Sequence, residues 1–152
     1  MNRFFQRWLE KFQSDHRTPD PQVLPADNSS IYAQLGGDQG VRAMAHRFYQ
    51  IMDEDPEVHA LRSIHPEALA GSEDKFFDFL SGWFDGPQRY VEKYGHPMLR
   101  ARHLPFRIDI AMRDQWLHCI YQTLDEQVTD PVLKNELRQR FTRLAHHMIN
   151  TD

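Results

Sequence analysis

Histidine is the residue type in this chain best suited to metal or cofactor chemistry, because nine of them occur in 152 residues. His103 is the most suggestive, since it lies in the segment GHPMLRARHLPF at positions 95–106. In that segment Pro97 fits the first turn of a helix, and Pro105 disfavours helix at the residue before it. Between the prolines we expect a short helix of about two turns, on which Leu99 and His103 share a face. A histidine beside apolar neighbours on such a helix suggests a ligand to a large, flat, apolar cofactor.

A zinc site is disfavoured by the spacing of the other histidines. His96 and His103 would lie about 10 Å apart on a continuous helix, which is too far for one ion. His146 and His147 are adjacent and face different directions. No His-Glu-x-x-His or Cys-x-x-Cys pair occurs, and residues for a hydrolytic triad or a phosphate-binding loop are also missing.

Composition restricts the class of protein further. The length suits one domain with a real core, and ten Phe, five Tyr and three Trp supply large buried surfaces. The net charge of -4 gives no electrostatic case for a nucleic-acid partner. The single cysteine, Cys119, excludes an intrachain disulfide and favours a cytoplasmic location. We expect no transmembrane span and no signal peptide, because no apolar run is long enough.

The first 29 residues differ in pattern from the rest. Apolar side chains recur at helical spacing within residues 1–13, at Phe5, Trp8, Leu9 and Phe12. This pattern predicts a helix that packs on the domain or on a partner subunit, as in a homo-oligomer; contact with a membrane surface and disorder are the alternatives. Residues 14–29 carry three prolines without periodicity and are expected to form a linker.

The remaining segments predict helices throughout, because none shows sustained two-residue alternation. The fold class is therefore all-α. A short helix is expected from Ile31 to the turn at Gly36-Gly37, followed by a helix that is capped by Asp38. A third helix is expected to start at Pro66 and to end at 85–87. The last two are expected from about Pro105 to Glu126 and after the cap Asp130-Pro131. Tyr49 is expected to point inward with a hydroxyl that needs a partner. Phe106 and Trp116 are expected to be buried by the helix from Pro105.

Three motifs together resemble a known family. They are Gly-Pro-Gln-Arg-Tyr at 86–90, the segment 95–106, and Trp116, thirteen residues after His103. The combination resembles the second group of the truncated (two-over-two) haemoglobins, and the match extends from about Ile31 to Asn150. The resemblance implies a two-over-two helical sandwich over residues 30–152, an extra N-terminal helical segment over 1–29, and haem b as cofactor.

On the proximal side, the resemblance implies that the outer ring nitrogen of His103 binds the haem iron. The other ring nitrogen would donate to a nearby carbonyl and fix the orientation of the ring. Arg102 resembles the family's partner for a haem propionate, with a solvated arginine as the alternative. The further residues expected against the haem are Leu99, Phe106, Leu80 and Tyr90.

On the distal side, Tyr49 and Trp116 correspond to the family's hydrogen-bond donors. A phenol O–H and an indole N–H aimed at bound oxygen, which carries partial negative charge, would slow its release. The alternative is that both are ordinary core aromatics. Phe76 and Ser72 match the positions over the iron, where Ser72 is a weak candidate donor.

Two positions depart from the family's pattern. Where the family carries Phe or Tyr at the haem edge, this chain has Ile64-His65-Pro66, and we align His65 with that position. An inward His65 could bond Tyr49 or the bound ligand, or bind ferric iron itself; a shift of one residue would place Ile64 inward instead. Asp85 stands where the family prefers glycine, which affects the local turn.

The function implied is a haem protein that binds oxygen and other small diatomic ligands, with redox use in nitric oxide or peroxide detoxification. Such turnover needs an external reductase, because no flavin or nicotinamide module is visible. The alternatives are simple oxygen binding or storage, and a gas-sensing or interaction module that makes contacts through residues 1–13. Whether the protein is an enzyme is left open by the sequence.

Overall fold

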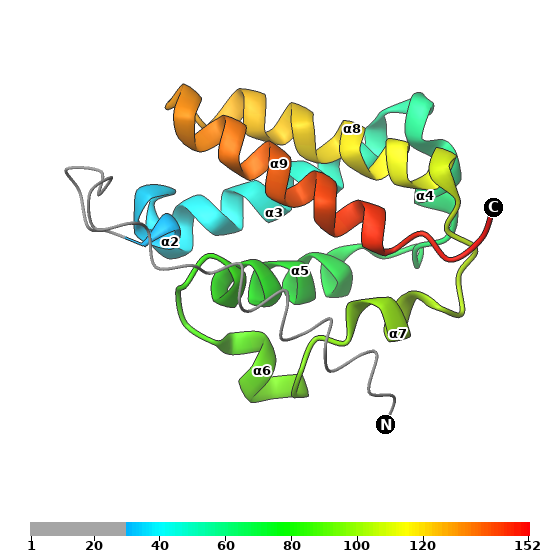
Figure 1. The fold of residues 1–152 in the computed structure, drawn as a ribbon, viewed down its shortest axis with the longest axis horizontal. Helices are drawn as coiled ribbons and strands as arrows, with labels where there is room; N and C mark the ends of the chain where they lie inside the picture. Colours follow the sequence, from blue (N-terminus) through cyan, green and yellow to red (C-terminus); the bar gives the residue numbers. More distant parts are fainter. Residues whose placement is uncertain (1–29) are drawn as a thin grey trace.

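The computed structural model describes residues 30–152, and every regular element in that range is helical (Figure 1). This confirms the expected all-α class. The elements in chain order are α2 (Ile31–Gln34), α3 (Gly37–Glu54), the 3-10 turn η1 (Pro56–Val58), α4 (His59–Ser63), α5 (Ala70–Trp83), α6 (Arg89–Tyr94), α7 (Leu99–His103), α8 (Ile110–Gln127) and α9 (Pro131–His147). The helix and linker expected within residues 1–29 lie outside the described residues.

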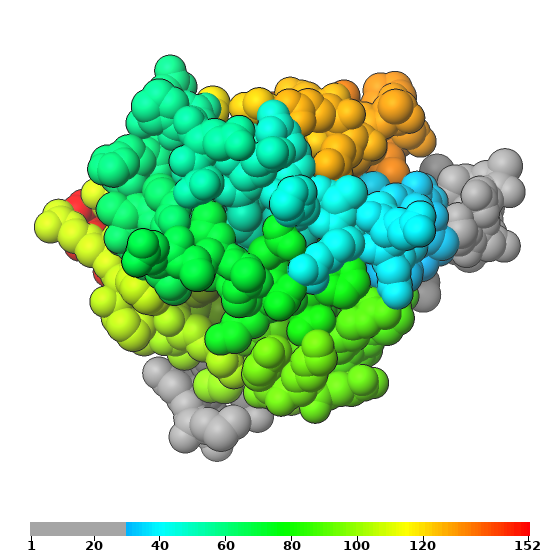
Figure 2. All heavy atoms as spheres, turned by 180° about the vertical axis from the view of Figure 1, so that it is seen from behind, coloured from blue at the N-terminus to red at the C-terminus, as the bar shows by residue number. Residues whose placement is uncertain are grey.

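The long helices form two packed pairs. Helix α3 packs on α5 and on α8, and α8 packs along α9. Figure 1 shows α8 and α9 side by side, with α5 below them and the short α6 and α7 beneath α5. From behind, α3 in cyan, α5 in green and the α6–α7 segment in yellow-green share one face (Figure 2). This arrangement confirms the two-over-two sandwich. Its interior is filled by completely or almost completely buried side chains, the largest being Phe48, Phe84, Phe141, Met44 and Met52.

Local sequence explains where several helices begin. Gly36 and Gly37 have φ values of 99° and 65°, so the turn between α2 and α3 uses a left-handed backbone that glycine adopts without strain. The carboxylate of Asp130 accepts the amides of Val132 at 2.9 Å and Leu133 at 3.4 Å, and Pro131 occupies the first helical position. The predicted start of α9 is therefore confirmed.

Four predicted helix starts are wrong, those of α3, α5, α7 and α8, and in three of them proline alone did not determine where the helix begins. Helix α5 begins at Ala70, not Pro66, and the guanidinium of Arg62 holds the carbonyls of Pro66 and Glu67 in the preceding loop. Helix α3 has Gly36 as its N-cap, while Asp38 lies in the first turn and pairs with Arg89 instead.

Helix α8 begins at Ile110, not Pro105, because the Asp109 carboxylate accepts the amide of Met112 and caps it there. Phe106 therefore precedes the helix and is 42% exposed, which corrects the expectation that it is buried.

The turn after α5 explains why glycine would suit position 85. Asp85 has a φ of 66°, in the left-handed region that disfavours most side chains. At the next position, a Cβ on Gly86 would lie 2.5 Å from the ring of Tyr32 and 2.8 Å from the carbonyl oxygen of Ser81. The chain passes too close to α2 there for any larger residue. The short helix α6 that follows was not predicted.

Within residues 30–152, no helix combines the length and the apolar character that crossing a bilayer requires.

Candidate functional site

The site is built around the imidazole of His103, in the last turn of α7. Its Nδ1 lies 2.5 Å from the carbonyl oxygen of Leu99, one helical turn earlier. A carbonyl oxygen can only accept, so Nδ1 carries the proton and a neutral ring keeps its lone pair on Nε2. No other hydrogen bond reaches this imidazole from the described residues. The expected donation to a nearby carbonyl is thus observed, and Nε2 is left available as a ligand.

Helix α7 is held in place by polar contacts with the end of the chain. It contains no buried residue and begins at Leu99, two residues later than predicted, after Met98 with a left-handed φ of 46°. The Arg100 guanidinium donates to the carbonyls of His147 at 2.8 Å and Ile149 at 2.7 Å. The Asn150 amide donates to the carbonyls of His103 at 3.2 Å and of Phe106 at 2.9 Å. Neither tether was predicted, since Arg100 was only expected to project away from the shared face.

A second group of predicted residues meets in an aromatic cluster. The ring of Tyr49 on α3 lies edge-on to Phe76 of α5 at 5.8 Å and to His65 at 5.9 Å, measured between ring centres. Trp116 of α8 lies 6.3 Å from Phe76. Phe48, which is almost completely buried, contacts three of these rings, with ring centres 4.8 to 5.3 Å apart. The fold therefore brings together four of the predicted distal residues, from α3, α5, α8 and the loop after α4.

Two polar groups in this cluster have no hydrogen-bond partner within residues 30–152. They are the hydroxyl of Tyr49 and the indole N–H of Trp116, on side chains that are partly buried, and polar groups removed from water are normally bonded. Burial is the main reason that the pKa of Tyr49 rises above its ordinary value, with the charge of Glu73 adding to it. The phenol is therefore protonated at neutral pH. Both groups are donors, so they fit a ligand that accepts hydrogen bonds.

His65 is fixed with its ring against Tyr49, which favours the alignment that places His65 inward. Its Nδ1 lies 2.9 Å from the carbonyl oxygen of Leu61. The amide of Leu61 in turn donates to the side-chain oxygen of Gln115 at 2.9 Å, beside Trp116 on α8. Desolvation lowers the pKa of His65 below its ordinary value, against the raising effect of the hydrogen bond to Leu61.

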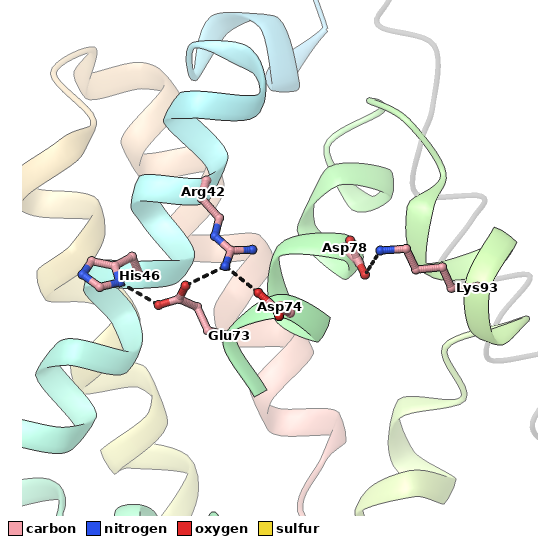
Figure 3. A network of polar contacts seen from close by, with 6 residues as sticks. All are labelled: Arg42, His46, Glu73, Asp74, Asp78 and Lys93. Carbon is pink, nitrogen blue, oxygen red and sulfur yellow. Dashed lines mark hydrogen bonds and ion pairs between the residues drawn. The ribbon is translucent and has the colours of Figure 1, made fainter. Parts of the chain in front are cut away.

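Charged residues tie α5 to its neighbours on the outside of this cluster. Figure 3 shows Arg42 and His46 of α3 both reaching Glu73, at 3.0 Å and 2.7 Å, while Arg42 also pairs with Asp74. Further along α5, the buried Asp78 accepts from Lys93 of α6 at 2.9 Å (Figure 3). The first set of pairs fixes the turn of α5 that carries Ser72. These ion pairs were not predicted, because they join residues that are distant in sequence.

The remaining predicted residues lie around α6 and α7. The Arg102 guanidinium lies 5.5 Å from the ring centre of Tyr90, which is itself buried, and it donates weakly to the carbonyl of Tyr94 at 3.4 Å. Leu80 is completely buried, and Leu99 packs partly against the core. Ser72 is half-buried and makes no hydrogen bond to the described residues. Ser72, Phe106 and Arg102 do not join the aromatic cluster.

The donor set fits a haem. Nε2 of His103 carries a lone pair and has no hydrogen-bond partner among the described residues, as an axial bond to iron requires, and a partly buried aromatic cluster supplies unpartnered hydrogen-bond donors. Apolar side chains around α7 are exposed, with Phe106 at 42% and Leu104 at 59%, so an apolar cofactor has surface to cover. His103 would be the ligand, and Tyr49, Trp116 and His65 would face a gas bound to the iron.

Comparisons with known proteins agree with this geometry. The family model of the bacterial-like globins matches residues 30–150. Group 2 truncated haemoglobin YjbI from Bacillus subtilis is 34% identical over 114 residues, which cover 75% of this chain and 84% of that protein. A cold-adapted truncated haemoglobin from the Antarctic bacterium Pseudoalteromonas haloplanktis TAC125 superposes with a TM-score of 0.81 at 48% identity, covering 82% of this chain and all of that one. A group II 2-on-2 haemoglobin from Agrobacterium tumefaciens gives 0.81 at 44%, covering 85% and 100%.

Proposed function

Because this chain belongs to the bacterial-like globins, as a group 2 truncated haemoglobin, we propose that it holds haem b through His103 and uses it on oxygen and other small diatomic ligands. Haem-based gas binding follows from the family itself. The observation that carries the assignment of His103 is its tautomer. Since Nδ1 donates to the Leu99 carbonyl, Nε2 presents a lone pair, and the hydrogen bond makes that nitrogen a stronger ligand.

The residues around α7 complete the proximal side in this proposal. Arg102, Leu99, Phe106, Leu80 and Tyr90 are assigned to the haem contact. Arg102 is exposed and stacked on Tyr90, which leaves its N–H groups room to pair with a propionate at the haem edge. The exposed ring of Phe106 would gain apolar contact, worth roughly 25 cal/mol for each Å² covered.

On the distal side, Tyr49 and Trp116 are assigned as the donors to the ligand. Haem supplies the iron that binds the gas, and the protein supplies hydrogen bonds to the partial negative charge that the gas acquires. Each such bond is worth on the order of 1 kcal/mol net, and more where water is excluded. His65, Ser72 and Phe76 complete the same side of the pocket.

We further propose that the protein works as a redox catalyst, converting nitric oxide and oxygen to nitrate or reducing peroxide. Donors that would retain oxygen would also suit peroxide, since both molecules accept hydrogen bonds. Each turnover that oxidises the iron needs an electron from outside, which we assign to a separate reductase. The alternative function is reversible oxygen binding, storage or sensing without turnover, in which the same donors hold the ligand.

The test begins with the colour of the purified protein. A Soret band in the wild-type protein that is lost in His103→Ala supports the haem assignment. A wild-type protein that shows no Soret band even after haem has been added to it contradicts the assignment. Stopped-flow measurement of oxygen dissociation and of nitric oxide consumption with excess reductant then separates the two uses. Slow oxygen release without rapid nitric oxide consumption would eliminate the nitric oxide reaction.

Two assignments concern the chain as a whole. We propose that residues 30–152 form the globin domain, in keeping with the family match over 30–150. Because its cysteine is unpaired and buried, a reducing cytoplasm is the proposed location.

A further inference from the structure

The connection between α7 and α8 exposes several large apolar side chains close together. Six large hydrophobic side chains are exposed among residues 30–152, and three of them lie between positions 104 and 110: Leu104 at 59%, Phe106 at 42% and Ile110 at 58%. Figure 1 shows this connection at the outer edge of the molecule, near the C-terminus. Exposed apolar side chains that gather in one place mark an interaction surface, whereas single ones need no explanation.

The proposed haem would cover only part of this surface. Phe106 is assigned to the haem contact, together with the face of α7 that carries Leu99 and His103. Leu104 follows His103 in a right-handed helical conformation, so its side chain points about 100° away from the imidazole around the helix axis. Ile110 begins the next helix and is not among the residues assigned to the haem. Leu104 and Ile110 therefore stay available to a partner.

Contacts with the end of the chain hold the connection in place. The side-chain amide of Asn150 donates to the carbonyl of Phe106 at 2.9 Å, and its oxygen accepts the amide of Ile108 at 3.0 Å. The backbone amide of Asn150 donates to the carbonyl of Ile108 at 2.9 Å, and the side chain of Ile108 is buried. A surface that is ordered before binding loses less conformational entropy on association, which favours a specific partner.

The connection is positively charged, although the chain as a whole is not. The segment 98–111 carries Arg100, Arg102 and Arg107 against a single acidic residue, Asp109, while the whole chain has a net charge of -4. Arg100 donates to main-chain carbonyls, which leave its charge uncompensated. Arg107 is exposed and forms no ion pair with the described residues. Even with Arg102 assigned to a haem propionate, positive charge exceeds negative charge beside the apolar side chains.

We propose that the connection between α7 and α8, at Leu104, Arg107 and Ile110, is the docking surface for an acidic electron-donor protein. This rests on the proposed function and gives the chemistry of the separate reductase. A small apolar surface beside positive charge suits the brief encounters of electron-transfer proteins, which opposite charges accelerate. A donor bound here contacts Leu104, which is bonded to the proposed iron ligand His103. The donor loses one electron and the ferric iron gains it, with no proton transfer at this surface.

The charge is tested by stopped-flow reduction of the haem-loaded ferric protein under carbon monoxide, with a reduced plant-type ferredoxin as the acidic donor. The second-order rate should fall as salt is added, because screening weakens the attraction between opposite charges. Arg107→Glu should lower the rate about tenfold at low salt. Arg143→Glu, the same change at an exposed position of α9, should alter it less than about twofold. A rate that does not respond to salt, or an equal loss in both variants, overturns the proposal.

The apolar contact is tested by Leu104→Ser. This change should slow reduction by ferredoxin about threefold, because less apolar area is covered in the encounter. The matched control is Val132→Ser, at a residue that is 76% exposed in the first turn of α9, and it should leave the rate unchanged. Photoreduced lumiflavin, a small neutral donor that needs no docking surface, should reduce every variant at the wild-type rate. If Leu104→Ser slows lumiflavin to the same extent, its effect lies in the haem site and the proposal is overturned.

A binding measurement needs no electron transfer. Reduced ferredoxin carries a paramagnetic cluster, which broadens the NMR signals of amides close to it. In the wild-type protein, as its diamagnetic ferrous carbon monoxide complex, we expect the amides of residues 104–111 to broaden first. Broadening centred elsewhere overturns the proposal. Sedimentation that shows a wild-type dimer, dissociated by Leu104→Ser, overturns it as well, because the surface then belongs to a second copy of this chain.

The two proposals fail differently. A red protein that ferredoxin reduces equally well with Arg107→Glu contradicts the docking surface alone. A protein that takes up no haem contradicts the proposed function, and the broadening of amides by ferredoxin then still tests the docking surface in that protein.

Discussion

The side-chain amide of Asn150 donates to the carbonyl oxygen of His103 across 3.2 Å, so the segment after α9 holds the end of the helix that carries the proposed iron ligand. The same amide reaches the carbonyl of Phe106, and its oxygen accepts the amide of Ile108 at 3.0 Å. One side chain therefore fixes three points along the connection between α7 and α8. Because α7 contains no buried residue, these contacts determine the position of His103.

Asn150→Ala should accelerate haem loss about tenfold, because α7 loses hydrogen bonds worth on the order of 1 kcal/mol each. The rate is measured by transfer of haem to an excess of an apoprotein acceptor. The matched control is Asn135→Ala, at an exposed position of α9, which should leave the rate unchanged. Equal rates in the two variants would show that the tether does not position His103.

His103→Ala should abolish stable haem binding while leaving the helical content intact, since the iron loses its axial nitrogen. Free imidazole added to the variant should restore a Soret band by supplying that nitrogen. His96→Ala, at an exposed position just before α7, is the control and should bind haem normally. A His103→Ala protein that retains haem without imidazole would disprove the assignment.

Trp116→Phe should accelerate oxygen dissociation about fivefold, because the indole N–H is lost while most of the aromatic packing is kept. The measurement is stopped-flow displacement of oxygen by carbon monoxide. Trp83→Phe, the same change in a tryptophan that stacks on Phe79, should affect stability but not this rate. An unchanged rate in Trp116→Phe would remove this residue from the mechanism.

Gly86→Ala should lower the free energy of unfolding by about 2–3 kcal/mol, because its Cβ would overlap the ring of Tyr32 and the backbone of Ser81. Gly71→Ala is the matched control. No atom lies within 4 Å of a Cβ at that position of α5, so alanine should stabilise the helix by about 0.5–1 kcal/mol. Urea unfolding of both variants checks the opposite signs, and two effects of the same sign would contradict the close approach.

Asp55 should make stability depend on pH in the acid range. The amide of Glu57 and the imidazole of His118 both bond its carboxylate and hold its pKa below the ordinary value. A lowered pKa in the folded state gives stability that is present at neutral pH and is lost as the pH falls through that value. Asp55→Asn should therefore destabilise at neutral pH, and this effect should shrink as the pH falls below the ordinary pKa of an aspartate, about 4. Thermal unfolding of both proteins over a series of pH values from neutral to acid tests this, and an effect that does not change with pH would contradict it.

Features that depend on local pattern could be predicted from the sequence. Periodicity and the Asp130-Pro131 cap predicted α9, and the glycine pair predicted the turn before α3. The approach of His103 to the Leu99 carbonyl also follows from their spacing of four residues. The spacing of Trp116 from His103, together with the motifs around it, was enough to indicate the family.

Other features depend on contacts between distant parts of the chain and could not be predicted. The start of α8 at Ile110 follows from the Asp109 cap and from the pairing of the buried Ile108 with Asn150, 42 residues away. Arg100 was expected to project away from the cofactor-facing side of its helix, yet it anchors α7 to carbonyls near the end of α9. The orientation of the His65 ring depends on the Leu61 carbonyl oxygen, whose position no pattern of residue types reveals.

The tethers of α7 end on main-chain carbonyls, those of His103, Phe106, His147 and Ile149, and every residue type carries such an oxygen. As far as these contacts are concerned, the side chain at 149 can change over evolutionary time, whereas Arg100 and Asn150 cannot. Aligned relatives should therefore keep a guanidinium at position 100 and a carboxamide at position 150 while the side chain at 149 varies, and correlated exchange between positions 100 and 149 should be missing.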